Sequence, residues 1–152
     1  MSKRILPIET DHDTGAVFAA AREHRLVVRS CSSCGADHHL PRAYCYHCGS
    51  FDLEWRQVAG RGTLYAWTVV EHPTHPAYEV PYTVVLVDLD EAPEVRLAGN
   101  LPGRPTLEVG MPMEVWWDDV DGQAVLPNWR PASQGPRALT EGHADGTELA
   151  PG

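Results

Sequence analysis

The chain has 152 residues, enough for one domain of ordinary size or for two very small ones. Its formal charge of −9 comes from 12 Lys and Arg against 21 Asp and Glu, and argues against a nucleic-acid binder, which needs a basic surface. No apolar run approaches the roughly 18 residues of a membrane span, and the N-terminus lacks the apolar stretch of a signal peptide. We therefore expect a soluble, cytoplasmic protein.

The net negative charge comes entirely from the second part of the chain. Residues 1–60 carry seven basic and seven acidic groups, whereas residues 61–152 carry five basic and fourteen acidic groups. The field around the second part would therefore repel phosphate groups at long range.

The first 28 residues predict an arm followed by a helix and a short strand. Asp13 or Thr14 can cap a helix that runs to about Glu23, and the run AVFAAAREH has good helix propensity. Residues 26–28, Leu-Val-Val, favour a strand that leads into the first cysteine pair. We treat residues 1–28 as one N-terminal segment.

Residues 29–52 contain all four cysteines, in two pairs of identical spacing. Cys31 and Cys34 form the first C-x-x-C-G, Cys45 and Cys48 form the second, and ten residues separate the pairs. This spacing lets two thiolates face one ion, and glycine after the second cysteine suits the positive φ of a tight knuckle. The pattern predicts a structural Zn²⁺ site, with iron as the alternative, because four thiolates accept either metal.

Four sulfurs would leave no open coordination position, so we expect the metal to support folding and to take no part in catalysis. Disulfides are not expected in a cytoplasmic protein. His38, His39 and His47 lie beside the cysteines, but a four-sulfur site needs none of them as a ligand.

Residues 53–131 read as a β-rich unit. Five strands are predicted, at residues 63–70, 82–89, 95–101, 113–117 and 124–126, with turn residues between them. Five strands in about 75 residues suggest a small closed or partly closed barrel, with a small sandwich as the rival architecture. The proline-rich link 101–112 leaves little space for a helix.

Residues 131–152 contain seven Gly or Pro among 22 and no aromatic residue. Such a segment cannot bury enough surface to order itself, so the tail, residues 132–152, is predicted to be disordered.

The sequence contains no recognisable catalytic motif. A P-loop, a G-x-S-x-G elbow and an H-E-x-x-H helix are all missing, and the cysteines are assigned to the metal, so we predict no catalytic residue. The candidates for partner or ligand contact are His72 and His75 in a proline-rich loop, Trp116 and Trp117, one of which must face outward, and Arg130.

The ordered set of motifs resembles a known family. The cysteine ribbon is followed by GRGTLYAWTVV at 60–70, VPYTVVLVDLD at 80–90, VGMPMEVWW at 109–117 and LPNWRP at 126–131. This order is similar to that of the zinc-ribbon plus OB-fold proteins that accompany thiolase-like and acyl-CoA-processing enzymes. The resemblance covers residues 12–131.

The resemblance implies a mainly β protein with an N-terminal helix, a rubredoxin-like zinc ribbon and a five-stranded OB-fold-like barrel. It implies that Cys31, Cys34, Cys45 and Cys48 bind the metal. It further implies a non-catalytic subunit of a hetero-oligomer, whose thiolase-fold partner is a thiolase, an acyltransferase or a steroid side-chain aldolase acting on CoA thioesters.

Three other functions remain open at this point. An acyl-CoA-binding module would place the CoA phosphates on Arg61, Arg96, Arg104 or Arg130, or at a subunit boundary. An OB-type barrel can bind single-stranded nucleic acid, although the charge of −9 disfavours this. A rubredoxin-like electron carrier would hold iron at the four sulfurs.

Overall fold

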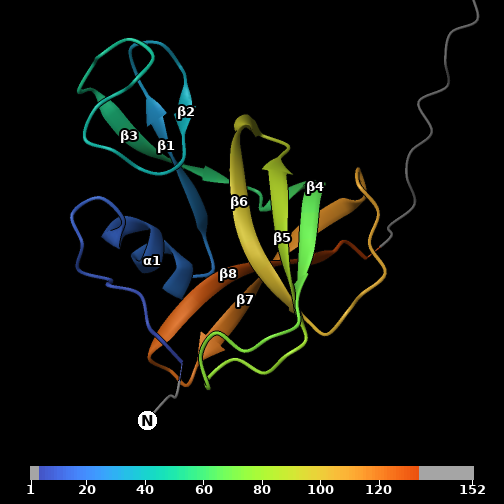
Figure 1. The fold of residues 1–152 in the computed structure, drawn as a ribbon. Helices are drawn as coiled ribbons and strands as arrows, with labels where there is room; N and C mark the ends of the chain where they lie inside the picture. The colour runs from blue at the N-terminus through green and yellow to red at the C-terminus, as the bar shows by residue number, and fades with distance from the viewer. Residues whose placement is uncertain (1–3, 134–152) are drawn as a thin grey trace, which may run out of the picture.

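Figure 1 shows the computed structural model of the chain, which describes residues 4–133. In that range one helix and eight strands follow in the order α1 (Gly15–Arg22), β1 (Leu26–Cys31), β2 (Asp37–His38), β3 (Leu53–Val58), β4 (Arg61–Val70), β5 (Tyr82–Leu89), β6 (Ala92–Pro102), β7 (Pro112–Val120) and β8 (Ala124–Pro131). The prediction of a mainly β protein with one leading helix is confirmed. From residue 134 onward, the predicted tail lies outside the described residues.

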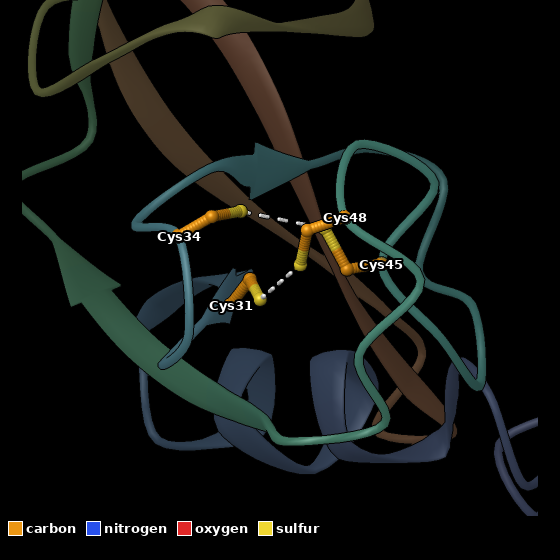
Figure 2. Close-up of side chains that lie close together, drawn as sticks. All are labelled: Cys31, Cys34, Cys45 and Cys48. Atoms are coloured by element: carbon orange, nitrogen blue, oxygen red, sulfur yellow. Dashed lines mark hydrogen bonds between the residues drawn. The ribbon is translucent and has the colours of Figure 1, made fainter.

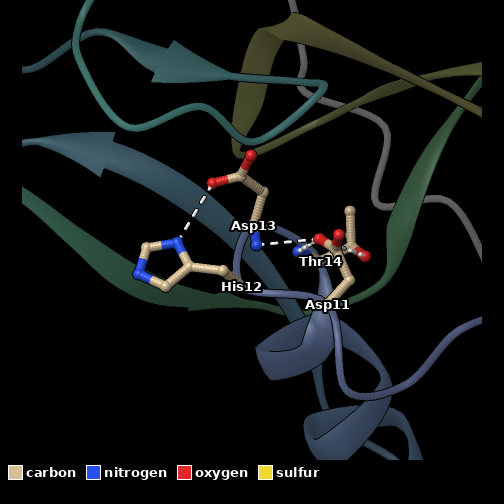
Figure 3. A network of polar contacts seen from close by, with 4 residues as sticks. All are labelled: Asp11, His12, Asp13 and Thr14. Atoms are coloured by element: carbon tan, nitrogen blue, oxygen red, sulfur yellow. Dashed lines mark hydrogen bonds and ion pairs between the residues drawn. The ribbon is translucent and has the colours of Figure 1, made fainter.

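The helix α1 begins after an acidic turn and lacks the predicted side-chain cap. Thr14 occupies the N-cap position, but its side chain makes no capping hydrogen bond. The Asp11 carboxylate accepts the backbone N–H groups of Asp13 and Thr14 at 2.8 and 2.9 Å, and the Thr14 hydroxyl at 3.2 Å (Figure 3). The Thr14 hydroxyl is thus engaged in the preceding turn, because a carboxylate three residues earlier competes for it.

Two ion pairs tie the N-terminal segment down. Arg4 lies 2.8 Å from the Asp118 carboxylate on β7. Arg22, in the last turn of α1, donates to the Glu9 carboxylate at 2.5 Å and to the Gln123 carbonyl at 2.6 Å. The helix is therefore anchored to the turn between β7 and β8.

The first sheet has three antiparallel strands in the order β2-β1-β3. The strand predicted at residues 26–28 extends to Cys31, because every residue from Leu26 to Cys31 pairs with β3. Cys31 lies opposite Leu53 at one end of this ladder, and Leu26 lies opposite Val58 at the other. Residues 53–58 thus pair with the ribbon and not with the larger sheet.

The second sheet has five antiparallel strands in the order β6-β5-β4-β7-β8. The five predicted barrel strands are all present, and four of them are longer than the sequence indicated. Strand pairing between β4 and β7 is limited to three positions, at Arg61, Gly62 and Thr63 of β4. Beyond this short junction the two parts of the sheet diverge, and in Figure 1 β7 and β8 run at a steep angle to β4, β5 and β6.

The two edge strands of this sheet, β6 and β8, meet without forming a ladder. The side-chain oxygen of Asn128 accepts the backbone N–H of Asn100 at 2.9 Å. At Gly99 a Cβ would lie only 2.8 Å from Trp129 Cδ1, so the absence of a side chain permits the close approach. The result is an OB-fold-like, partly closed barrel, in which β6 and β8 approach each other through side-chain contacts and no strand pairing joins them.

One hydrophobic core runs through both sheets. Its centre is made of fully buried barrel residues, among them Leu64, Val85, Met113 and Trp129. Leu26, Val28 and Val58 of the first sheet belong to the same cluster. The ribbon is thus packed onto the barrel through β1 and β3.

Candidate metal centre

Two matching turns present the four cysteines. The first follows β1, where the Gly35 N–H donates to the Cys31 carbonyl at 2.7 Å; in the second, the Gly49 N–H donates to the Cys45 carbonyl at 2.8 Å. Gly35 and Gly49 have φ values of +76° and +77°, in the left-handed region that glycine adopts without strain. The prediction of two knuckles closed by glycine agrees with this geometry.

The four sulfurs face a common centre (Figure 2). All of them lie within 4.8 Å of one another, and the Cys31–Cys48 and Cys34–Cys45 sulfur pairs are 3.7 and 3.6 Å apart. In a tetrahedral zinc site with Zn–S bonds of about 2.3 Å, neighbouring sulfurs are about 3.8 Å apart. The cysteines are free thiols with the separations of a metal site, and we describe the cluster as metal-binding.

Close packing of the thiols lowers the pKa of Cys31 and raises the pKa of Cys34 relative to an ordinary cysteine. Burial raises the pKa of Cys31, but the N–H groups of Cys34 and Ser33 and the adjacent thiols outweigh burial and hold it at about 7. The Ala36 N–H lowers the pKa of Cys34, yet burial and the other three sulfurs raise it to about 12. All four sulfurs could be negative together only with a cation among them, a charge that a bound divalent metal would supply.

His38 touches the cluster, which the sequence reasoning did not anticipate. Its Nε2 lies 3.2 Å from the Cys45 sulfur, and its side chain is only 2% exposed. Burial first, and then the nearby His47, lower the pKa of His38 below its usual range. The only sequence signal was proximity to the knuckles, and His39 and His47 share it.

Trp116 and Trp117 lie on opposite faces of β7, as strand geometry requires. Trp117 packs against the hydrophobic core and stacks on His24, with ring centroids 5.4 Å apart and planes within 6°. Trp116 lines a cavity of about 560 Å³ together with Tyr78 and Tyr82. Its indole nitrogen is buried and has no hydrogen-bond partner among the described residues.

The other predicted contact residues are not gathered into one site. His75 accepts the Ala77 N–H at 3.2 Å, and its ring lies against Tyr78, so the loop before β5 approaches the Trp116 cavity. His72 is exposed in the same loop. Arg130 lies on β8, where it donates to the Glu114 carboxylate at 2.9 Å.

A second cavity, of about 330 Å³, was also missed from the sequence. It lies between α1, β1 and the edges of β6 and β8, and its walls are mainly apolar, including Phe18, Val28, Leu97, Leu126 and Trp55. These residues come from five elements, so no local pattern could indicate the cavity.

In residues 4–133, no helix has the length and apolar character needed to cross a membrane.

Two family profiles match the chain in succession. The profile described as the ChsH2 rubredoxin-like zinc ribbon domain matches residues 18–54, and the profile described as the ChsH2 C-terminal OB-fold domain matches residues 55–118. The first match contains all four cysteines, and the second contains β4, β5, β6 and most of β7.

Two curated relatives are similar over most of this chain. A probable enoyl-CoA hydratase alpha subunit of Thermomonospora curvata is 42% identical over 124 residues, which are 80% of this chain and 38% of the relative. The 3-oxo-4,17-pregnadiene-20-carboxyl-CoA hydratase alpha subunit of Mycobacterium tuberculosis is 27% identical over 122 residues, 79% of this chain and 36% of that protein. The chain thus spans little more than a third of these relatives.

A solved structure described as the Ltp2-ChsH2(DUF35) aldolase contains a chain that is similar to this one over most of its length. The two chains share 40% sequence identity and superpose with a TM-score of 0.75, over 84% of this chain and 100% of the other. Together, the two profile matches and this full-length similarity show that the chain belongs to the ChsH2 (DUF35) family of zinc-ribbon plus OB-fold proteins.

Proposed function

We propose that the metal is Zn²⁺ and that its role is structural. Cys31, Cys34, Cys45 and Cys48 would hold it, and four thiolates would complete its coordination. The ion would cross-link the two knuckles of a segment that has few aliphatic residues of its own. Metal analysis of the purified chain tests this: one equivalent of zinc in a colourless protein supports the proposal, whereas stoichiometric iron would favour the electron-carrier alternative.

We propose that the chain is a non-catalytic subunit that supports a thiolase-fold enzyme acting on CoA thioesters. The observation that carries this proposal is the similarity to the ChsH2 chain of the Ltp2-ChsH2(DUF35) aldolase over that chain's whole length. The four thiols, which are the chain's strongest nucleophiles, are assigned to the metal. The reacting groups would therefore come from the partner, and the two proteins would form a hetero-oligomer in the cytoplasm.

The substrate would be an acyl-CoA whose carbon–carbon bond is cleaved or formed, with steroid side chains as the leading class. The similarity to a pregnadiene carboxyl-CoA hydratase subunit and to an aldolase supports this class. We propose no catalytic residue in this chain.

The partner or ligand contacts are proposed at residues that the structure leaves accessible. His72 and His75 belong to the loop before β5, and Trp116 lines the adjoining cavity. Arg130 is half exposed on β8, and Trp117 would act indirectly because its ring is engaged with His24 and the core.

Co-expression with a thiolase-like protein from the same genome tests the subunit proposal. A stable complex on size-exclusion chromatography is expected, with acyl-CoA aldolase or thiolase activity that the partner alone lacks. Trp116→Ala should weaken the complex, and Trp67→Ala, on the outer face of β4, serves as the matched aromatic control. A fully active partner that never co-elutes with this chain would refute the proposal.

An acyl-CoA-binding module is the second candidate, and the apolar cavity of about 330 Å³ favours it. Such a cavity would accept an acyl chain better than the CoA phosphates, since the barrel half of the chain is acidic. Calorimetry on the isolated protein decides: binding of a medium-chain acyl-CoA but not of free CoA supports the module, and no heat with either argues against it.

A further inference from the structure

The four sulfurs of the cysteine cluster differ in how easily water can reach them. Cys34 and Cys48 are exposed, so water can solvate them, whereas Cys31 and Cys45 are 1% and 0% exposed. Four thiolates around a divalent ion carry a net charge of −2, and a buried charge is costly unless donors reach it. Backbone N–H groups of Ser33 and Cys34 serve Cys31.

At Cys45 a side chain lies in the position of such a donor. His38 Nε2 is 3.2 Å from the Cys45 sulfur, well within the range of a hydrogen bond to sulfur. A metal-bound thiolate has no proton to give, so in the loaded protein this contact must run from the imidazole N–H to the sulfur.

The His38 ring is held in place for this contact. His38 is the second residue of β2, where it pairs with Arg29 of β1, and its ring lies 4.4 Å from the Tyr46 ring. The other nitrogen, Nδ1, is buried and has no hydrogen-bond partner among the described residues. A ring whose only polar contact is made through Nε2 fits the tautomer that carries its proton there.

We propose that His38 is a positioning residue of the metal centre, which donates Nε2–H to the Cys45 thiolate and thereby strengthens metal binding. The hydrogen bond withdraws charge from the sulfur that water cannot reach. Partners of this kind, which contact a ligand and not the metal, typically change metal affinity by about 10- to 100-fold. This inference rests on the proposed zinc at the four sulfurs.

The test compares two side chains of similar shape in the full chain. His38→Met removes the N–H donor, whereas His38→Gln keeps an amide N–H at the ε position. We expect zinc affinity, measured by competition with a chelator, to fall about 10- to 100-fold in the Met variant and to be largely restored in the Gln variant. His47→Phe is the control, since its ring is 5.6 Å from His38 and the sulfur–imidazole hydrogen bond is made by His38.

Cobalt substitution adds a readout that loss of packing would not move. Removing a hydrogen bond raises the energy of the sulfur electrons, so the sulfur-to-cobalt charge-transfer bands should move to longer wavelength in His38→Met and return in His38→Gln. If the Met variant does not fold, His38→Phe keeps a ring against Tyr46 and takes its place.

Two results would overturn the inference while leaving the zinc proposal intact. One is equal affinity and identical cobalt spectra in the wild type and the donor-free variants. The other is a wild-type site with three sulfurs and one nitrogen by X-ray absorption, which would make His38 a ligand. A wild-type chain that binds no zinc or cobalt would refute the zinc proposal itself and, with it, this inference.

Discussion

The side-chain oxygen of Asn128 on β8 accepts the backbone N–H of Asn100 on β6 at 2.9 Å. Asn128 is 4% exposed, and its amide nitrogen lies 3.4 Å from the Asp118 carboxylate on β7. A single buried amide therefore connects β6, β7 and β8 at the seam, the place where β6 and β8 meet without a ladder. Its removal would leave the N–H of Asn100 without this acceptor.

We expect Asn128→Ala to lower the free energy of unfolding by about 1–3 kcal/mol, the cost of a buried polar group left unpaired. Urea denaturation followed by tryptophan fluorescence measures this. Asn100→Ala is the matched control, because the seam uses the backbone of Asn100 and not its side chain. Equal effects of both substitutions would show that the seam does not depend on the Asn128 amide.

Any side chain at Gly99 should lower the stability of the protein. A Cβ there would lie 2.8 Å from Trp129 Cδ1 and 3.0 Å from the Trp129 backbone nitrogen, so β6 and β8 would have to separate. We predict that Gly99→Ala destabilises the protein by about 1–3 kcal/mol, the usual cost of overpacking. The neighbouring substitution Ala98→Ser, at an exposed position, should have little effect on thermal unfolding; a Gly99→Ala variant as stable as wild type contradicts the prediction.

Cys45→Ser should make zinc binding substoichiometric and lower the melting temperature, because it replaces one of the four proposed sulfur ligands with a poor one. Mass spectrometry of the metal and differential scanning calorimetry measure the two effects. Ser33→Ala removes a hydroxyl that contacts only Ser50, at 2.8 Å, and should retain one equivalent of zinc. Full zinc content in Cys45→Ser would exclude Cys45 as a ligand.

Asp11 should remain ionised to lower pH than an ordinary aspartate. The N–H groups of Thr14 and Asp13 donate to its carboxylate, and these hydrogen bonds lower its pKa below 3.8. A depressed folded-state pKa means that the contribution to stability is complete above the unfolded pKa and is lost as pH falls through the folded value.

Carbon-detected NMR of the Asp11 carboxyl group checks the direction of this shift. Asp11→Asn should make the unfolding of α1 less dependent on pH below about 4, the range in which an ordinary aspartate titrates. Thr14→Ala removes only the hydroxyl donor, so the pKa of Asp11 should stay low. A titration at the ordinary value would mean that the turn shown in Figure 3 is not formed in solution.

The metal centre could be predicted from the sequence because its geometry is local. Each C-x-x-C-G fixes its own turn, and the remaining step is only to bring two such turns together. The five barrel strands were also predictable, since β-branched and aromatic residues in them are bounded by turn residues.

The remaining features depend on residues far apart in the chain. The strand at residues 26–28 was expected to be short, because only pairing with β3 extends it to Cys31. The roles of His38 and Asn128 likewise arise from a contact with a residue seven or more positions away. A side-chain amide in one strand does not reveal which backbone N–H it will meet.

Strand β1 belongs both to the hydrophobic core and to the cysteine cluster. Its first half, at Leu26 and Val28, is embedded in the interior that the barrel shares, and its last residue, Cys31, supplies a sulfur. Six consecutive residues thus join the cysteine cluster to the hydrophobic core that contains Trp129. Loss of a metal ion bound there should lower the stability of the barrel as well as of the ribbon. Cells starved of the metal would then lose the protein as a whole.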